Sequence, residues 1–214
     1  GTRGSLGVMP LTLEHLFSVM RGQTRQRFRV RISYIEVYNE CVYDLLNPAA
    51  ANGAHGAGAN AFGGLDLRED PEKGMFVAGV REEEVTDVGQ VLQLLERGNA
   101  RRTTESTRAN ATSSRSHAVL AIAIESRDAL ADVRTELRLG KLSLIDLAGS
   151  ERMGKTSNAG QRLREGNNIN RSLLALANCI NALGEKSKRG SFVNYRDSKL
   201  TRLLKESLGG NSKT

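Results

Sequence analysis

Alternating apolar and polar residues predict strands at several places along the chain. "RFRVRISYIEVYNE" alternates in this way and is rich in β-branched and aromatic residues, which predicts a strand from about Phe28 to Tyr38. "GMFVAGV" indicates a short strand, and "HAVLAIAIESR" and "LGKLSLIDLAG" indicate two longer ones. The last of these is nearly continuously apolar, so we expect it to lie centrally in a covered sheet.

Apolar residues at helical spacing predict four helices. The first two are "PLTLEHLFSVM" and "VGQVLQLLERGN", the second expected to end at Gly98. "NNINRSLLALANCINALGEK" contains one apolar stripe, which we expect Gly184 to terminate. Its members are Ile169, Leu173, Leu176, Ile180 and Leu183. "SKLTRLLKESL" places its leucines on one face and Lys199 and Arg202 on the other. Strands interspersed with helices predict a three-layer α/β domain.

Composition excludes several classes of protein. Hydrophobic residues make up 39% and charged residues 26%, which is ordinary for a globular domain, and no apolar run approaches the roughly 18 residues of a membrane span.

The first residues lack the apolar core of a signal peptide and a starting methionine, so we expect the chain to begin partway through a larger protein. The chain contains only two cysteines, Cys41 and Cys179, and they lie far apart in the sequence, which favours a reducing interior without a disulfide. Residues 49–64, rich in Ala and Gly, are expected to form a flexible surface insertion.

The net charge of +7 is distributed unevenly. Residues 152–214 contain thirteen Lys and Arg against four Asp and Glu, a net charge of +9, which leaves −2 for residues 1–151. This asymmetry indicates an acidic polymer as a partner, and nucleic acid or an acidic protein surface would both fit. A solvated basic face is the plainer alternative. Aromatic residues are only 4% and none is interleaved as a stacking platform among the basic residues, which argues against nucleic acid.

The segment "DLAGSERMGKT" matches the phosphate-binding formula G-x-x-x-x-G-K-T, with Lys155 in the lysine position. A true phosphate-binding loop needs a helix opening at that lysine, whereas "SNAGQRLREGNN" contains glycines and asparagines and no apolar stripe. The preceding strand ends in Asp146, which is instead typical of the strand that orients Mg²⁺ in such enzymes. Upstream, "NATSSRSH" combines hydroxyls with an arginine, which is suited to sensing a γ-phosphate, although the hydroxyls could simply satisfy a loop backbone.

Five segments together resemble the kinesin motor domain: "ISYIEVYNECVYDLLNP", "NATSSRSH", "LIDLAGSE", "NINRSLLAL" and "YRDSKLTRLLKESLGGN". They occur in family order and cover most of the chain outside the insertion. "VNYRDSKLTRLL", "ANCINAL" and "REDPEKGMFVAGV" look most like the kinesin-8 class, which walks to microtubule ends and influences their length. The resemblance implies a kinesin-type fold, with a central mixed sheet and helices on both faces, here lacking the N-terminal strands and the phosphate-binding loop.

The resemblance also divides the chain into segments. These are the insertion (49–64), switch I (110–117), switch II (146–151), a loop (152–168), the relay helix (169–183), and a microtubule-binding loop and helix (185–208). By resemblance, Lys155 belongs to a loop that faces the microtubule rather than to a phosphate cradle.

The resemblance further implies roles for individual residues. Ser113 and Ser114 would contact the γ-phosphate and Mg²⁺, with Mg²⁺ held by Ser114 and by a water on Asp146. The amide of Gly149 would sense the γ-phosphate. Glu151 would take the proton from the attacking water through a hydrogen-bonded chain. Ser113, Glu151 and Arg115, which would pair with Glu151, form the expected catalytic set.

For the whole protein, the resemblance implies a microtubule-stimulated ATPase with ATP and Mg²⁺ as cofactors, located in the cytoplasm on microtubules, including those of cilium or spindle. We expect no nucleic-acid or membrane partner, a dimer formed through segments outside this chain, and no ATPase activity from this chain alone. A microtubule-binding module without its own ATPase is the alternative. The expected microtubule-contacting residues are Arg152, Lys155, Lys186, Lys188, Arg189, Arg196, Lys199 and Arg202.

Overall fold

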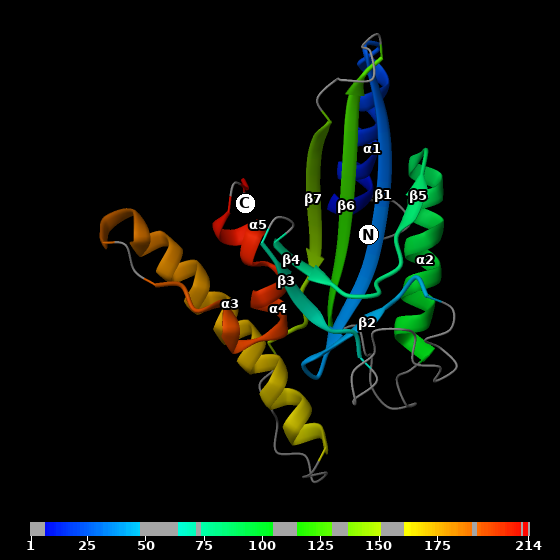
Figure 1. Cartoon of the computed structure of the whole chain (residues 1–214). Coiled ribbons are helices and arrows are strands. Elements are labelled where there is room, and N and C mark those ends of the chain that lie inside the picture. The colour runs from blue at the N-terminus through cyan, green and yellow to red at the C-terminus, as the bar shows by residue number, and fades with distance from the viewer. Residues whose placement is uncertain are drawn as a thin grey trace.

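The structure, a computed structural model, describes residues 7–47, 64–71, 74–104, 115–129, 137–150, 161–189, 192–210 and 212–213. Its elements are α1 (Val8–Gly22), β1 (Gln26–Tyr38), β2 (Cys41–Asp44), β3 (Leu67–Asp70), β4 (Gly74–Val77), β5 (Glu83–Val85), α2 (Val88–Thr104), β6 (His117–Asp128), β7 (Arg138–Asp146), α3 (Gln161–Arg189), the 3₁₀ turn η3 (Tyr195–Asp197), α4 (Lys199–Leu203) and α5 (Lys205–Gly209). The main sheet has the order β2-β1-β6-β7, and β5 also pairs with β1 (Figure 1). Every described strand pairing is antiparallel.

The long strand β1 serves both faces of the sheet because successive side chains point to opposite sides. Val30, Ile32 and Tyr34 belong to one hydrophobic core. Ile35 and Val37 belong to a second core on the opposite face. The alternation read from the sequence therefore becomes a sheet that is buried on both sides, which confirms the three-layer α/β architecture.

Helices α1 and α2 cover the first face. Pro10 lies in the first turn of α1, where the missing N–H leaves no hydrogen bond unmade, and Leu13 and Phe17 from α1 are buried in the core. In α2, Gly98 lies against β1: a Cβ built on it would come 2.6 Å from Cδ1 of Tyr34. The glycine allows the helix to approach the strand closely, and so fixes how α2 is seated.

The second face carries α3, α4 and the hairpin of β3 and β4 (Figure 1). The tight turn between β1 and β2 reaches both helices. Its two residues, Asn39 and Glu40, have positive φ angles of 50° and 60°. The Asn39 side chain accepts a hydrogen bond from Asn168 of α3, and Glu40 accepts one from the backbone N–H of Lys199 at 2.9 Å. The turn thus anchors the N-terminal end of α4 to the sheet.

Three of the expected helices have boundaries that differ from the prediction. Helix α2 continues past Gly98 to Thr104, and α3 spans Gln161–Arg189 rather than 169–183, passing through Gly184. The glycines cost only about 1 kcal/mol each in a helix interior, which tertiary packing can outweigh. The expected single helix over "SKLTRLLKESL" is divided at Leu204 into α4 and α5.

The apolar stripe of α3 is also rotated relative to the expected one. Ile180 is 52% exposed, whereas Ser172 and Cys179 are buried beside Ile169 and Leu176. A stripe counted from apolar residues alone could not detect Ser172, because its burial depends on a polar partner.

The expectation of a central, covered strand at "LGKLSLIDLAG" was wrong for the part of the chain that the structure describes. There β7 pairs with β6 alone, and Leu139 is 73% exposed. Only one edge of this strand has a described partner.

The remaining expectations concern the insertion, the cysteines and the membrane. Residues 49–63 of the insertion lie outside the described residues. Cys41 and Cys179 are both free thiols, as expected. Within the described ranges, none of the helices combines the length and the apolar character needed to cross a bilayer.

Candidate functional site

The pairing of β6 with β7 brings the two motif segments together. In this antiparallel register Ala118 lies opposite Asp146, so the start of β6 and the end of β7 share one end of the sheet. Arg115 and Ser116 lead into β6 there, and residues 147–150 leave β7 there. Segments that are about 30 residues apart in sequence therefore meet at one place.

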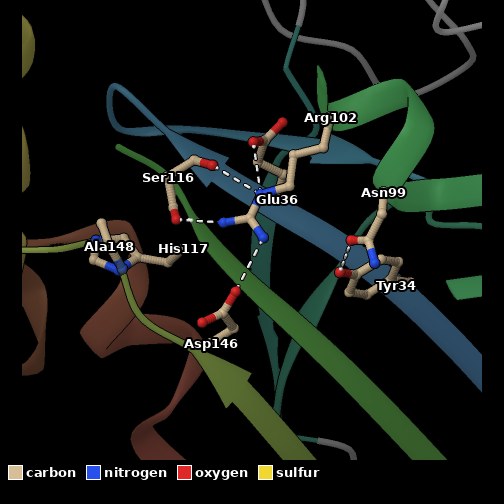
Figure 2. A network of polar contacts seen from close by, with 8 residues as sticks. All are labelled: Tyr34, Glu36, Asn99, Arg102, Ser116, His117, Asp146 and Ala148. Carbon is tan, nitrogen blue, oxygen red and sulfur yellow. Dashed lines mark hydrogen bonds and ion pairs between the residues drawn. The ribbon is translucent and has the colours of Figure 1, made fainter. Parts of the chain in front are cut away.

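Arg102, near the end of α2, connects these segments (Figure 2). Its guanidinium donates from Nε to Ser116 Oγ at 3.0 Å and from Nη2 to the Ser116 carbonyl at 2.6 Å. Nη1 donates to Asp146 Oδ2 at 3.1 Å. Oε1 of Glu36 lies 3.4 Å from Nε. One side chain thus holds the entry to β6 and the exit from β7.

The two carboxylates around Arg102 lie in different environments. Only 4% of the Glu36 side chain is exposed, so its charge depends on the buried guanidinium. The Asp146 side chain is 59% exposed although one of its oxygens accepts a hydrogen bond from Arg102. Asp146 is therefore oriented by the protein and still accessible from solvent, which suits a carboxylate that holds a hydrated cation.

His117, the first residue of β6, connects the segment after β7 to a third element, helix α3. Its Nδ1 accepts a hydrogen bond from the Ala148 N–H at 3.0 Å, and its Nε2 lies 2.8 Å from Ser172 Oγ in α3. The pKa of His117 is lowered from 6.5 to about 4, mainly by burial and also by the charge of Arg102, while the charge of Asp146 opposes the shift. The ring is therefore neutral near pH 7.

The position of Arg102 is supported by a second contact between α2 and β1. The Tyr34 hydroxyl donates to Asn99 Oδ1 at 2.7 Å, three residues before Arg102 in the helix (Figure 2). Burial is the main reason that the pKa of Tyr34 is raised. The phenol thus remains protonated and able to donate this bond.

The structure describes only part of the catalytic set expected from sequence. Asp146 is inside the Arg102 network, Gly149 follows it, and Arg115 is half-buried beside Ser116. Ser113, Ser114 and Glu151 lie outside the described residues, and so does any pairing of Glu151 with Arg115.

Sequence reasoning missed several residues of the site. Arg102 lies in none of the quoted segments, and Glu36 lies inside "ISYIEVYNECVYDLLNP" but was given no role. Ser116 and His117 lie inside the quoted "NATSSRSH" and Ser172 lies inside the quoted "NINRSLLAL", but none of the three was given a role. The quoted family-like segments were the available signal for Glu36, Ser116, His117 and Ser172, whereas no sequence signal indicated Arg102.

The expected microtubule-contacting residues lie in several parts of the chain. Arg196 is exposed in η3, and Lys199 and Arg202 are partly exposed in α4. The 3₁₀ turn and the helix have local caps: Asn194 accepts from the Arg196 N–H, and Ser198 accepts from the Thr201 N–H.

The other basic residues of this set cannot be placed in the same way. Lys186, Lys188 and Arg189 belong to α3, but their side chains are not described. Arg152 and Lys155 lie outside the described residues.

Comparison with known proteins gives a consistent result. The family model described as "Kinesin motor domain" matches residues 1–214. The kinesin-like protein KIN-8B of Arabidopsis thaliana is 51% identical over all of this chain, and KIF19 and KIF18B of Mus musculus are each 49% identical over all of it. The chain spans only 25%, 20% and 24% of these relatives, respectively.

Solved structures show the same fold. A fast kinesin superposes with a TM-score of 0.76 and 39% identity, over 96% of this chain and 54% of its own. KIF14, solved as a dimer with AMP-PNP in complex with a microtubule, superposes with a TM-score of 0.81 and 38% identity, over 100% of this chain and 58% of its own.

Proposed function

Since the chain belongs to the kinesin motor domain family, and is similar to kinesin-8 members of it, we propose that it is part of a motor that couples ATP hydrolysis to movement along microtubules or to regulation of their ends. The observation that carries this proposal is the Arg102 network, which holds the start of β6 and the end of β7 in one place. A nucleotide-dependent motor needs its two phosphate-sensing segments to be mechanically connected.

Asp146 and Gly149 are the described residues with which the protein would respond to nucleotide. The Asp146 carboxylate is fixed by Arg102 on one oxygen and accessible to water, so it fits the role of holding a water on Mg²⁺. Among the residues that the structure describes, no group of three or more His, Cys, Asp or Glu could form a cage for a metal. This fits Mg²⁺, which proteins usually bind through one or two carboxylates together with waters and substrate phosphates.

Ser113 and Ser114 complete the proposed nucleotide site, with Ser114 as a direct ligand of Mg²⁺. When bound, the cation would neutralise charge on the phosphates of ATP. The amide of Gly149 would donate to the γ-phosphate. Its position depends on the preceding residue, because the Ala148 N–H donates a hydrogen bond to His117 Nδ1.

Glu151 and Arg115 are the proposed catalytic pair. Phosphoryl transfer depends mainly on positioning and charge stabilisation, so a paired Arg and Glu could orient the attacking water while Glu151 accepts its proton. The half-buried position of Arg115, directly before the Ser116 that Arg102 holds, supports a fixed orientation for this side chain.

The basic C-terminal part of the chain is the proposed microtubule surface. Residues 152–214 carry a net charge of +9, and the exposed positions of η3 and α4 belong to this part. An acidic partner surface would be attracted to it at ordinary ionic strength. The proposed contacts are Arg152, Lys155, Lys186, Lys188, Arg189, Arg196, Lys199 and Arg202.

The test is the ATPase activity of the complete protein with and without microtubules. We expect stimulation by microtubules, loss of turnover in Glu151→Ala, and retention of measurable ATP binding in that variant. Normal stimulated turnover in Glu151→Ala would refute the catalytic assignment. Microtubule binding without any ATP turnover in the wild type would support the non-catalytic module instead.

A further inference from the structure

A continuous chain of buried hydrogen bonds runs from the segment after β7 into the middle of α3. The Ala148 N–H donates to His117 Nδ1, His117 Nε2 contacts Ser172 Oγ, and the Ser172 hydroxyl donates to the carbonyl of Ile169 at 2.7 Å. The side chains of His117 and Ser172 are both in residues only 2% exposed. Water therefore does not compete for these bonds.

The direction of every bond in this chain is determined by its first donor. A backbone N–H can only donate, so Nδ1 of His117 must be the unprotonated nitrogen. A neutral ring then carries its proton on Nε2, which donates to Ser172 Oγ. The hydroxyl proton of Ser172 remains for Ile169, so each group has the partner that it requires.

This series of hydrogen bonds is a short connection between the segment of Ala148 and Gly149 and helix α3. Along the backbone, Gly149 is connected to α3 through residues 151–160, which the structure does not describe. Through His117, Ala148 is connected to α3 by two hydrogen bonds. His117 also directly follows Ser116, whose hydroxyl and carbonyl both accept from Arg102. A displacement of Ala148 must therefore either move Ser172 or break a buried bond.

We propose that His117 is a positioning residue that couples the segment carrying Gly149 to helix α3 through Ser172. This inference rests on the proposed function, because it assumes that the Gly149 segment responds to nucleotide and that the basic surface beyond α3 responds to microtubules. His117 would touch neither partner. It would transmit the state of one region to the other, in both directions, because coupling between two sites is reciprocal.

The test uses Ser172→Val and Ser172→Thr in the complete protein. These side chains have nearly the same shape and differ only in a methyl or hydroxyl group, and Thr in a helix can still donate to a preceding carbonyl. Release of a fluorescent ADP analogue is measured with and without microtubules, and the ratio of the two rates reports the coupling. Losing one buried hydrogen bond should lower this ratio about fivefold to tenfold in Ser172→Val, and Ser172→Thr should restore most of it. Ser172→Ala repeats the loss without added volume, in case valine disturbs the packing.

A second readout does not depend on microtubules. Hydrogen exchange at the Ala148 amide should accelerate about fivefold to tenfold in Ser172→Val relative to Ser172→Thr, while exchange at Ile32 in the buried part of β1 stays unchanged. Equal ratios and equal Ala148 exchange in the two variants would overturn the inference. If wild-type ADP release is not stimulated by microtubules, the proposed function fails, and the exchange measurement still decides whether His117 couples these two regions.

Discussion

Nη1 of Arg102 donates a hydrogen bond to Oδ2 of Asp146 at 3.1 Å, although 44 positions separate these residues in the sequence. The same guanidinium lies 3.4 Å from the buried carboxylate of Glu36. Arg102 therefore serves two purposes. It compensates a charge inside the protein, and it orients a carboxylate that remains accessible to solvent.

Replacing Arg102 tests the first of these purposes. Arg102→Met should destabilise the protein by about 3–5 kcal/mol, because it leaves the Glu36 carboxylate buried without a counter-charge. Glu36→Gln removes that charge, so the double variant Arg102→Met/Glu36→Gln should be more stable than Arg102→Met alone. Urea denaturation of the wild type, both single variants and the double variant would measure this difference. Strictly additive losses would show that the two groups do not interact.

The role of Arg102 also shows where sequence reasoning reaches its limit. Arg101 and Arg102 are adjacent and chemically identical, yet the structure directs Arg101 to the carbonyl of Leu45 and Arg102 into the centre of the site. Which arginine points inward depends on the rotation of α2 against β1. That rotation is fixed by a contact distant in sequence, between Gly98 and Tyr34, and no local pattern encodes it.

Other parts were accessible from local patterns because their cause is local. Alternation along β1 and the apolar run of β7 predicted both strands, and Asp146 was recognised from its place at the end of its strand. The length of α3 was underestimated because Gly166 and Gly184 are weak helix formers, whereas buried contacts made elsewhere in the helix outweigh them. Among the described strands β7 pairs with β6 alone, and the apolar run of β7 does not encode how many partners the strand has.

The seating of α2 can be tested at Gly98. Gly98→Ala would place a Cβ 2.6 Å from Cδ1 of Tyr34 and 3.3 Å from Cβ of Leu45. Overpacking of this kind costs about 1–3 kcal/mol, which should exceed the gain of about 1 kcal/mol from alanine in a helix. We expect a lower melting temperature, measured by circular dichroism.

Gly184→Ala is the matched control for Gly98→Ala. It is also a glycine inside a helix, but nothing lies within 4 Å of a Cβ built on it. The same substitution should therefore stabilise the protein by about 0.5–1 kcal/mol. Equal shifts of the melting temperature in the two variants would mean that the contact between α2 and β1 is unimportant.

The buried imidazole of His117 predicts a dependence of stability on pH. Its pKa is about 4 in the folded protein, below the ordinary 6.5, mainly because of burial. The unfolded chain therefore binds a proton between these values while the folded protein does not. Stability is complete above about pH 6.5 and falls as the pH is lowered towards 4, by on the order of 2 to 3 kcal/mol.

The variant His117→Gln should reduce this loss, because glutamine does not titrate. The free energy of unfolding, measured by urea denaturation at several values between pH 4 and 7, would show a shallower slope than in the wild type. His15→Gln is the control, since His15 lies exposed on α1. An unchanged slope in His117→Gln would contradict the burial of a neutral ring.

Lys155 distinguishes a microtubule-facing loop from a phosphate cradle. By its resemblance to the kinesin family, Lys155 belongs to the loop that follows switch II rather than to a phosphate cradle. Lys155→Ala should therefore leave the affinity for ATP unchanged in the absence of microtubules. Microtubule affinity should weaken modestly, since one exposed charge contributes on the order of 1 kcal/mol or less. A large loss of ATP affinity, measured by equilibrium titration, would make the segment a nucleotide site after all.

The charges on α4 test the proposed microtubule surface. Lys199 and Arg202 project from a helix whose Leu200 is completely buried, so both can be reversed without disturbing the core. Lys199→Glu/Arg202→Glu should weaken microtubule binding by about tenfold at low salt, if each exposed charge contributes roughly 0.5–1 kcal/mol. The dependence of binding on salt should also become flatter, because fewer attractive charges remain for salt to screen.

The control for this experiment must change the net charge equally at a different place. Arg21 and Arg25 are exposed near the end of α1, on the opposite face of the sheet from α4. Arg21→Glu/Arg25→Glu lowers the net charge by the same amount, so any general electrostatic attraction would weaken equally in both double variants. A specific surface on α4 requires the greater loss of affinity, and the flatter salt dependence, in Lys199→Glu/Arg202→Glu. Equal losses of affinity in a co-sedimentation assay would mean that the basic C-terminal part attracts microtubules only through its net charge. Unchanged affinity of Lys199→Glu/Arg202→Glu at low salt would exclude these residues from the interface.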